Sequence, residues 1–345
     1  MDLLSFNDCL KLVKGKKHLL LGNGFSISCR PSIFTYGNLF TQAQPKFNTQ
    51  LNDAFNAIDT KDFEVVMKSL KNAASLSEIY DKGNSYKKKM TDDSNLLKNI
   101  LVSTIASSHP AQPNDITQTE FNTCRKFLAN FENKYTLNYD LLLYWTLMHE
   151  QPFSNLKIKH DDGFRTPSDG KTDYVTWEIN NTNQQTVFYL HGALHLFDAG
   201  EELQKFTWVN TGVRLTEQIT AALDKDFYPL FVSEGSSSEK REKISHSGYL
   251  SRGIRSFANI GGTLFVYGHS LADNDDHITN LIPESRIDHI FISIYGDPGS
   301  QANNNIILKA GKLVEDRRAI NVKKPKGAVP LHLYFYDAAS TSIWK

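Results

Sequence analysis

Four short stretches of this sequence combine glycine or a turn with side chains that can bind a phosphate or move a proton. They are Gly22-Asn23-Gly24-Phe25-Ser26, Thr136-Leu137-Asn138-Tyr139-Asp140, His191-Gly192 and Gly268-His269-Ser270-Leu271. The runs before them read as strands, most of them apolar and buried. Glycine lets the backbone approach a ligand closely, and a helix start offers free N–H groups to a phosphate. Together these residues suit the binding of a phosphate-containing ligand beside an amide, a carboxylate and an imidazole.

The first stretch follows the apolar run 18–21 and is typical of a strand that turns sharply into a helix. We expect its backbone N–H groups and the Ser26 hydroxyl to hold a pyrophosphate. The third glycine of the dinucleotide-binding fingerprint is missing, so an ordinary turn remains the alternative.

The second stretch places an amide and a carboxylate at a strand-to-helix turn. Asp140 alone is explained more simply as the cap of the helix expected over 141–148. Asn138 lies just before that cap, where no structural need is evident. Asn138 is therefore the stronger candidate for a role in the chemistry.

His191 follows the strand expected over 186–190. A lone histidine at such a place is usually structural, and composition alone makes His195 and His246 equal candidates.

A polar cluster follows the strand expected over 263–267. It contains His269, Asp273, Asp275, Asp276 and His277. Asp275 can cap a helix, and Asp and His can bind divalent ions. Because no spacing here is diagnostic of a metal site, we predict no metal.

Strands and helices alternate through most of the chain. Further strands are expected over 229–233, 289–295 and 331–336, and helices over 213–223 and 250–257. This alternation predicts an α/β fold with a Rossmann-like, doubly wound, mostly parallel sheet. In such sheets ligands bind beyond the carboxyl ends of the strands, where the four stretches lie.

Two segments depart from this alternation. Apolar residues at helical spacing, such as Phe63, Val66 and Met67, predict a helical insertion subdomain over 46–131. Residues 152–184 are polar and predict an irregular or β-rich excursion with a short strand near Trp177. We interpret residues 1–345 as a single domain that contains both segments.

Composition limits the class of protein. Lysine plus arginine (38) balance aspartate plus glutamate (38), so no basic footprint indicates direct binding of nucleic acid. The three cysteines, Cys9, Cys29 and Cys124, form no C-x-x-C pair, which favours a reducing compartment and disfavours a thiolate zinc site. No signal peptide and no apolar run of roughly 20 residues is evident. We therefore expect a cytoplasmic protein that does not bind a membrane.

In their order along the chain, the four stretches resemble the sirtuin-like superfamily. That superfamily has a glycine turn after its first strand, a loop over the nicotinamide, a Thr-x-Asn-x-Asp motif, a His-Gly step and a later Gly-x-Ser-Leu turn. The chain is more similar still to a bacterial uncharacterised family within the same clan. This resemblance extends to about residue 310 and is carried by residues 18–40, 135–145, 189–197, 229–235 and 264–277.

The chain also differs from true sirtuins. The four zinc cysteines are absent, Asn23 replaces the usual alanine, and only Phe34 and Tyr36 stand near the place of the Asp-Phe-Arg step. These differences disfavour protein deacylation. Sirtuin-like proteins without the zinc module are often NAD-consuming effectors of bacterial antiphage defence. The resemblance therefore implies an NAD glycohydrolase (NADase) with NAD as its substrate.

The resemblance also implies roles for individual residues. Asn138 would orient the ribose or a water, His191 would act near neutral pH on a ribose hydroxyl or as a general base, and Asp140 would support the site. The expected NAD-binding residues are Gly22, Asn23, Gly24, Phe25, Ser26, Phe34, Gly268 and Ser270.

An unrestrained NADase would drain its host, so we expect a regulatory or sensor protein partner, a homo-oligomer, or both. Two alternatives stay open: a non-catalytic nucleotide sensor, and an NAD-dependent deacylase or ADP-ribosyltransferase.

Overall fold

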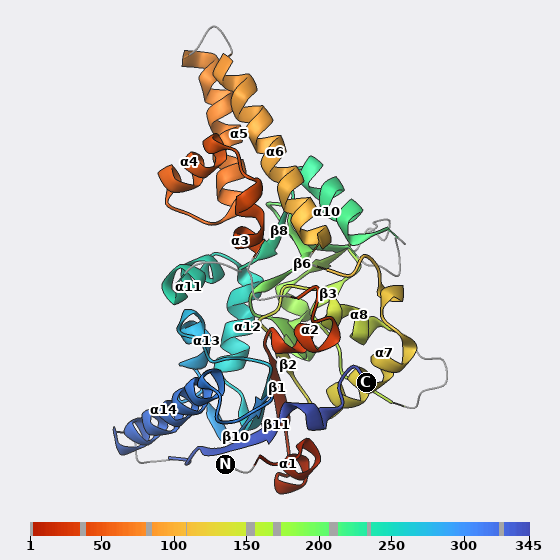
Figure 1. Cartoon of the computed structure of the whole chain (residues 1–345), viewed down its shortest axis with the longest axis vertical. Coiled ribbons are helices and arrows are strands. Elements are labelled where there is room, and N and C mark those ends of the chain that lie inside the picture. The colour runs from red at the N-terminus through yellow and green to blue at the C-terminus, as the bar shows by residue number, and fades with distance from the viewer. Residues whose placement is uncertain are drawn as a thin grey trace.

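A six-stranded, all-parallel sheet lies at the centre of the computed structural model (Figure 1). The structure describes residues 3–34, 39–80, 85–107, 109–149, 156–167, 174–206, 213–232, 236–323 and 328–345. The strands are β1 (Lys17–Leu21), β2 (Lys134–Thr136), β5 (Val187–Tyr189), β9 (Gly261–Tyr267), β10 (Arg286–Ile294) and β11 (His332–Asp337). Their spatial order is β11-β10-β9-β1-β2-β5.

This order is that of a Rossmann-type sheet. Numbered along the chain, the six strands stand in the order 3-2-1-4-5-6 when read from β5 to β11. The order reverses between β1 and β9, and the crevice at that point is the usual ligand site of the fold. The predicted α/β class and parallel sheet are thus confirmed.

Helices cover both faces of the sheet, which explains why its central strands are apolar on both sides. Successive side chains of β1 alternate between two cores: Leu19 and Leu21 join one, and Leu20 joins the other. The first core includes residues of α1 (Phe6–Leu12), α2 (Gly24–Cys29) and α7 (Gln118–Leu128). The second includes residues of α12 (Gly248–Ala258), α13 (Asp276–Thr279) and α14 (Gln301–Lys323).

A second, antiparallel sheet is built from segments on either side of β5 in the sequence. Its order is β3-β4-β7-β6-β8, from β3 (Phe164–Arg165), β4 (Tyr174–Trp177), β6 (Gly192–Asp198), β7 (Leu203–Phe206) and β8 (Tyr228–Phe231). The strand expected over 229–233 is present as β8, but it pairs antiparallel with β6 and does not belong to the parallel sheet. Residues 233–235 lie outside the described residues, as do 151–155 and 168–173 near the predicted excursion.

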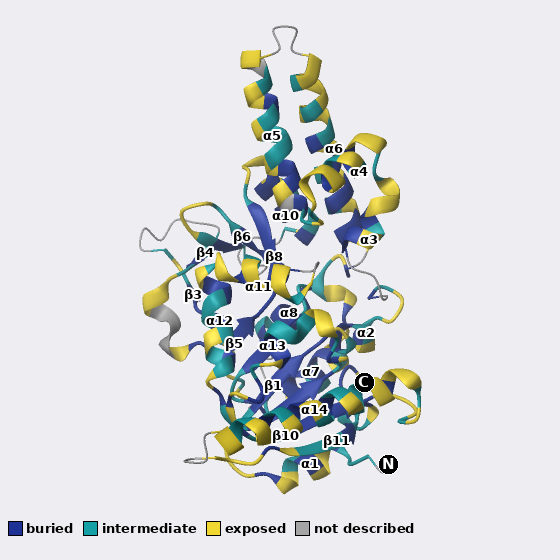
Figure 2. Cartoon of the chain, turned by 90° about the vertical axis from the view of Figure 1, so that its left-hand side faces the viewer, coloured by how far each residue is buried: buried dark blue, intermediate teal, exposed yellow. Residues whose placement is uncertain are grey.

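Within the described part of 46–131 the regular elements are helical. Besides α7 they are η1 (Gln44–Lys46), α4 (Thr49–Ile58), α5 (Phe63–Tyr80), α6 (Ser85–Ser107) and η2 (Pro113–Asp115), and α3 (Leu39–Ala43) precedes them. The pair α5–α6 projects away from the sheet and becomes more exposed toward its tip (Figure 2). In contrast, α7 packs on the sheet, where the Phe127 ring lies 5.5 Å from that of Tyr267. The subdomain assignment of 46–131 remains a prediction.

The remaining helices lie between strands, apart from η5, which follows β11. They are α8 (Leu142–Met148), η3 (Ile179–Gln184), α10 (Leu215–Asp224), α11 (Ser237–Ser245), η4 (Asp273–Asp275) and η5 (Ala338–Thr341). None of the described helices is both long and apolar enough to cross a membrane.

Candidate active site at the switch point of the parallel sheet

A cavity of about 900 Å³ opens at the carboxyl ends of β1, β2, β5 and β9. All four sequence-predicted stretches contribute to its wall, because parallel strands end at the same edge of the sheet. The predicted site residues that line it are Gly22, Asn23, Gly24, Phe34, Asn138, Asp140, His191, Gly268 and Ser270. Tyr36, noted beside Phe34, lies outside the described residues.

The glycines after β1 and β9 bring two turns into direct backbone contact. A Cβ atom on Gly24 would lie 2.6 Å from Gly268 Cα, and Gly268 has a φ of +67°, which disfavours other residues. The Gly24 N–H donates to the Gly268 carbonyl at 2.8 Å. The need for glycine here is thus explained by packing between the two turns, which places both in the cavity wall.

This packing uses the N–H groups that were expected to hold a pyrophosphate. Gly22, Gly24, Phe25 and Ser26 all donate their N–H groups to carbonyl oxygens of the two turns. Among the described residues, the Asn23, His269 and Ser270 N–H groups have no such partner, and all three residues line the cavity. The N–H donors available to a ligand are therefore those of these three residues.

Two predicted binding residues do not border the cavity. Ser26 is fully buried, and its hydroxyl donates to Asp140 Oδ2. Phe25 is also buried, with its ring 5.2 Å from that of Trp344. Both side chains point into the core from the first turn of α2, so the expected contact of the Ser26 hydroxyl with a pyrophosphate does not fit this arrangement. The assignment of the two residues to NAD binding remains a prediction.

Ser26 instead orients Asn138. The Asn138 Nδ2 group donates to Ser26 Oγ at 2.9 Å and to the Gly22 carbonyl at 3.1 Å. Since Ser26 gives its own proton to Asp140, it can only accept from Asn138. Both amide protons are thus used, which leaves Asn138 Oδ1 as the acceptor for a ligand.

Asp140 connects this network to α8. Its Oδ1 accepts from the Leu142 N–H at 2.9 Å. Asp140 thus binds the first N–H of α8, as the simpler interpretation expected, although Leu141 and not Asp140 is the N-cap residue. His109 stands beside it: Nε2 accepts from the Leu141 N–H at 2.9 Å and Nδ1 lies 2.7 Å from the Pro110 carbonyl. These partners define a neutral His109 with its proton on Nδ1. Burial raises the pKa of Asp140 and lowers that of His109.

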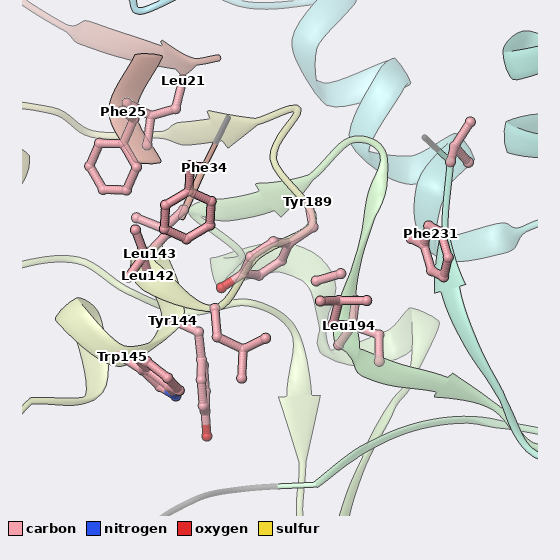
Figure 3. Close-up of a cluster of buried hydrophobic side chains, with 14 of the residues drawn as sticks. Leu21, Phe25, Phe34, Leu142, Leu143, Tyr144, Trp145, Tyr189, Leu194 and Phe231 are labelled. Atoms are coloured by element: carbon pink, nitrogen blue, oxygen red, sulfur yellow. The ribbon is translucent and has the colours of Figure 1, made fainter. Parts of the chain in front are cut away.

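Apolar side chains form the wall behind these groups. Figure 3 shows Phe34, Leu143, Tyr189 and Leu194 within one buried cluster. Phe34 is 9% exposed and borders the cavity, and its ring meets His109 edge-on at 5.9 Å. Phe34 is thus placed where an aromatic ring can contact a ligand.

The backbone of His191 is fixed at the junction of the two sheets. It lies in the tight turn between β5 and β6, and its carbonyl accepts from the Val232 N–H at 2.7 Å. The next residue, Gly192, has a φ of +71°, and a Cβ there would lie 2.0 Å from the Leu230 carbonyl oxygen. Only glycine therefore fits at position 192 beside β8. The tight turn that results fixes the backbone from which the His191 imidazole extends.

A cluster of charged and imidazole side chains surrounds His191. His191 Nε2 lies 3.0 Å from His277 Nε2 and 4.0 Å from Asp275 Oδ1. Asp275 also accepts from Lys240 Nζ at 2.8 Å and pairs with His269 Nε2 at 3.1 Å. The sequence indicated His269, Asp275 and His277 as a cluster but gave no signal for Lys240 or His109, which reach the site from distant helices and loops.

Comparison with known proteins matches residues 19–344 to a family described as a domain of unknown function, DUF4917. The chain belongs to the DUF4917 family. No curated protein matches the chain.

Burial sets the protonation of the imidazoles in the DUF4917 site. It lowers the pKa of His191 to about 3 and that of His277 to about 4. Burial alone would raise the pKa of Asp275, but the hydrogen bond from His269 and the neighbouring positive charges hold it below its ordinary value. The expectation that His191 titrates near neutral pH is therefore wrong, and both His191 and His277 are neutral there.

The same cluster could in principle hold a divalent ion. Ligand-type atoms of His191, Asp275 and His277 lie within 4.8 Å of one another. However, the Lys240 ammonium group occupies Asp275 Oδ1, where it would repel a cation. The two imidazoles are also hydrogen-bonded to each other. We interpret the group as a hydrogen-bonded cluster, and the lack of a metal remains a prediction.

Proposed function

We propose that this chain is a sirtuin-like NAD glycohydrolase that cleaves NAD to nicotinamide and ADP-ribose. One observation carries the proposal: a single cavity at the switch point of a Rossmann-type sheet gathers the two glycine turns, Asn138 and His191. Its volume lies near the upper end of the roughly 300–1,000 Å³ of ligand pockets, as a dinucleotide requires.

The proposed reaction breaks the bond between nicotinamide nitrogen and ribose C1′. The bonding electron pair goes to the cationic nicotinamide ring, which leaves as a neutral molecule, so no strong acid is needed. C1′ passes through an oxocarbenium-like state and then bonds to a water oxygen. One proton of that water remains to be removed. The protein must therefore orient the ribose, place the water and accept a proton.

The residues of the cavity divide these tasks. Asn138 Oδ1, fixed through Nδ2, accepts a hydrogen bond from a ribose hydroxyl or from the attacking water. His191, neutral at pH 7, is the general base. Asp140 and Ser26 hold Asn138 in place. The pyrophosphate lies along the turns that contain Asn23 and Ser270, and Phe34 covers the nicotinamide side.

In the cell, the proposed activity depletes NAD during antiphage defence, in the cytoplasm and under the control of a protein partner, self-association or both. This part rests on the resemblance to zinc-free sirtuin-like effectors and on the need to restrain such an enzyme. The missing zinc cysteines support hydrolysis over protein deacylation.

Incubation of the purified chain with NAD, followed by chromatography of nicotinamide, tests the proposal. We expect Asn138→Ala to lower kcat by at least about 100-fold, because the amide acts on the reacting ribose or water. Asn95→Ala, at an exposed position of α6, is the matched control and should keep the wild-type rate. Saturable NAD binding without nicotinamide release would instead favour a nucleotide sensor, and release that needs an acceptor protein would favour a transferase or deacylase.

A further inference from the structure

The proposed hydrolysis leaves one proton in the cavity at each turnover, and that proton must leave a buried site. The His191 side chain is only 4% exposed. We propose that His277 and Ser237 continue from His191 as a proton relay, which carries this proton from the cavity to the surface. The inference rests on the proposed function and adds two residues that act through His191.

The relay is a continuous set of close contacts between three elements. His191 Nε2, in the turn after β5, lies 3.0 Å from His277 Nε2 on α13. His277 Nδ1 lies 3.3 Å from Ser237 Oγ at the start of α11, and the His277 N–H also donates to that oxygen at 2.8 Å. His191 is buried, whereas His277 and Ser237 are partly exposed. The contacts therefore lead from the cavity wall outward.

The position of Ser237 is fixed by the start of its helix. Ser236 caps α11 in a capping box: its hydroxyl oxygen accepts from the Glu239 N–H, and the Glu239 carboxylate accepts from the Ser236 N–H. The two imidazole rings stack at a centroid distance of 5.1 Å and an angle of 17°. The geometry is therefore set by packing before any ligand enters.

The hydrogen bonds of the relay can run in either direction. In one arrangement Ser237 donates to His277 Nδ1, His277 donates through Nε2 to His191, and the His191 proton is on Nδ1. In the other, His191 donates through Nε2 to His277, which donates through Nδ1 to Ser237. In the second arrangement His191 Nδ1 carries a lone pair, and it has no partner among the described residues. That nitrogen is the base available to a reactant in the cavity.

The transfer is balanced in protons and involves no redox step. The attacking water gives a proton to His191 Nδ1 as its oxygen bonds to C1′. The proton on His191 Nε2 passes to His277 Nε2, and the proton on His277 Nδ1 passes to Ser237 Oγ, which releases its own proton to solvent. One proton enters the relay and one leaves it. The hydrogen bonds then point the other way, and reorientation of Ser237 and both rings restores them.

The charges around the relay favour transfer of the proton through the two histidines and disfavour a histidine that stays protonated. Asp275 of η4 lies 4.0 Å from His191 Nε2 and stabilises a transient imidazolium ion. Positive charge on either His191 or His277 is opposed by nearby basic groups. These are Lys240 and Arg241 of α11 and His269 after β9. With a pKa of about 3 for His191 and about 4 for His277, neither ring keeps the proton at neutral pH.

Substitution of His277 tests the relay. We expect His277→Gln to lower kcat at pH 7 by about 10-fold or more, with KM changed less than about 2-fold and with a larger solvent isotope effect. Imidazole added to the His277→Ala variant should restore part of kcat, which a purely structural defect would not allow. His246→Gln, at the exposed end of α11, is the matched control. Wild-type kcat and pH profile in His277→Gln would overturn the relay.

A measurement without turnover separates this inference from the proposed function. ¹⁵N NMR of histidine-labelled protein should show both neutral tautomers of His191 in the wild type and a change in their ratio in His277→Gln. A single His191 tautomer, the same in both proteins, would overturn the relay even where NAD is cleaved. A wild-type chain that releases no nicotinamide would instead overturn the proposed function, while the two-tautomer pattern would still support the relay.

Discussion

At the scale of residues, the site depends on groups that are buried, paired and neutral. Asn138 is held through both amide protons, and His109 and His191 are kept uncharged by burial. Hydrogen bonds between residues far apart in sequence set these states, as between Ser26 and Asp140. A chemical role here is therefore a property of the surroundings of a side chain and not of its type alone.

The buried neutral state of His191 predicts acid sensitivity. Its pKa falls from an ordinary 6.5 to about 3 in the folded chain, so between these pH values the unfolded chain binds more protons than the folded chain. Stability therefore decreases as the pH falls from 6.5 toward 3. In thermal melts, we expect His191→Gln to lose less stability than the wild type between pH 6.5 and 4.

The exposed His246 provides the control for this pH effect. His246→Gln should follow the wild-type melting curve, since this residue ends α11 at the surface. Asp275, whose pKa is held below its ordinary value, stays ionised over the same range. Parallel pH profiles for the wild type and His191→Gln would contradict the neutral, buried His191.

At the scale of elements, the sequence predicts what local pattern determines. Apolar runs that end in glycine or polar residues located β1, β5 and β9, and with them the carboxyl edge where the site lies. The strand with which another strand pairs cannot be predicted from local sequence. The run that forms β8 resembles a parallel core strand, yet it pairs antiparallel with β6.

The same limit applies to the site. Asn138, Asp140 and His191 could be named because each follows a strand. Lys240 and Ser237 could not, because they belong to the polar helix α11, and its contacts with Asp275 and His277 arise only in the folded chain. The sequence also could not show that N–H groups of the first glycine turn donate to carbonyl oxygens at the end of β9 and in the second turn.

The contact between the two glycine turns predicts a large effect of a small substitution. Gly24→Ala would place a Cβ 2.6 Å from Gly268 Cα, and neither turn can move without shifting β1 or β9. We expect a loss of roughly 1–3 kcal/mol in the free energy of unfolding, measured by denaturant titration. NAD binding by the remaining folded protein should change less, since the Gly24 N–H already bonds to Gly268.

Gly311 on α14 is the matched control for this substitution. A Cβ there would meet nothing within 4 Å, so Gly311→Ala should be neutral or stabilise the chain by up to about 1 kcal/mol. Equal stability of the Gly24→Ala and wild-type proteins would show that the turns are not packed as described.

At the scale of the whole molecule, one cavity is shared by both sheets and by the C-terminal segment. The wall includes Leu194 of β6 and Val232 after β8, and also Ala338 and Ile343 near the C-terminus. No described residue of α5 or α6 lines this cavity. The pair projects from the body of the molecule (Figure 1). A partner bound at α5–α6 would therefore have to act on the proposed site through the elements packed between them.

The last prediction concerns control by a partner. A partner or assembly can activate the chain only by binding its active arrangement more tightly than its resting one, and a shift from 1% to 99% active needs about 10⁴-fold preference. We expect cells that produce this chain alone to keep normal NAD levels and growth. The roughly 1% of molecules in the active arrangement still release nicotinamide slowly in a concentrated purified sample, but too slowly to deplete a cell. The Asn138→Ala chain, produced at the same level, separates loss of NAD by catalysis from toxicity of the protein itself. Rapid NAD loss with the wild-type chain but not with Asn138→Ala, without infection or partner, would show that the enzyme is active and unrestrained.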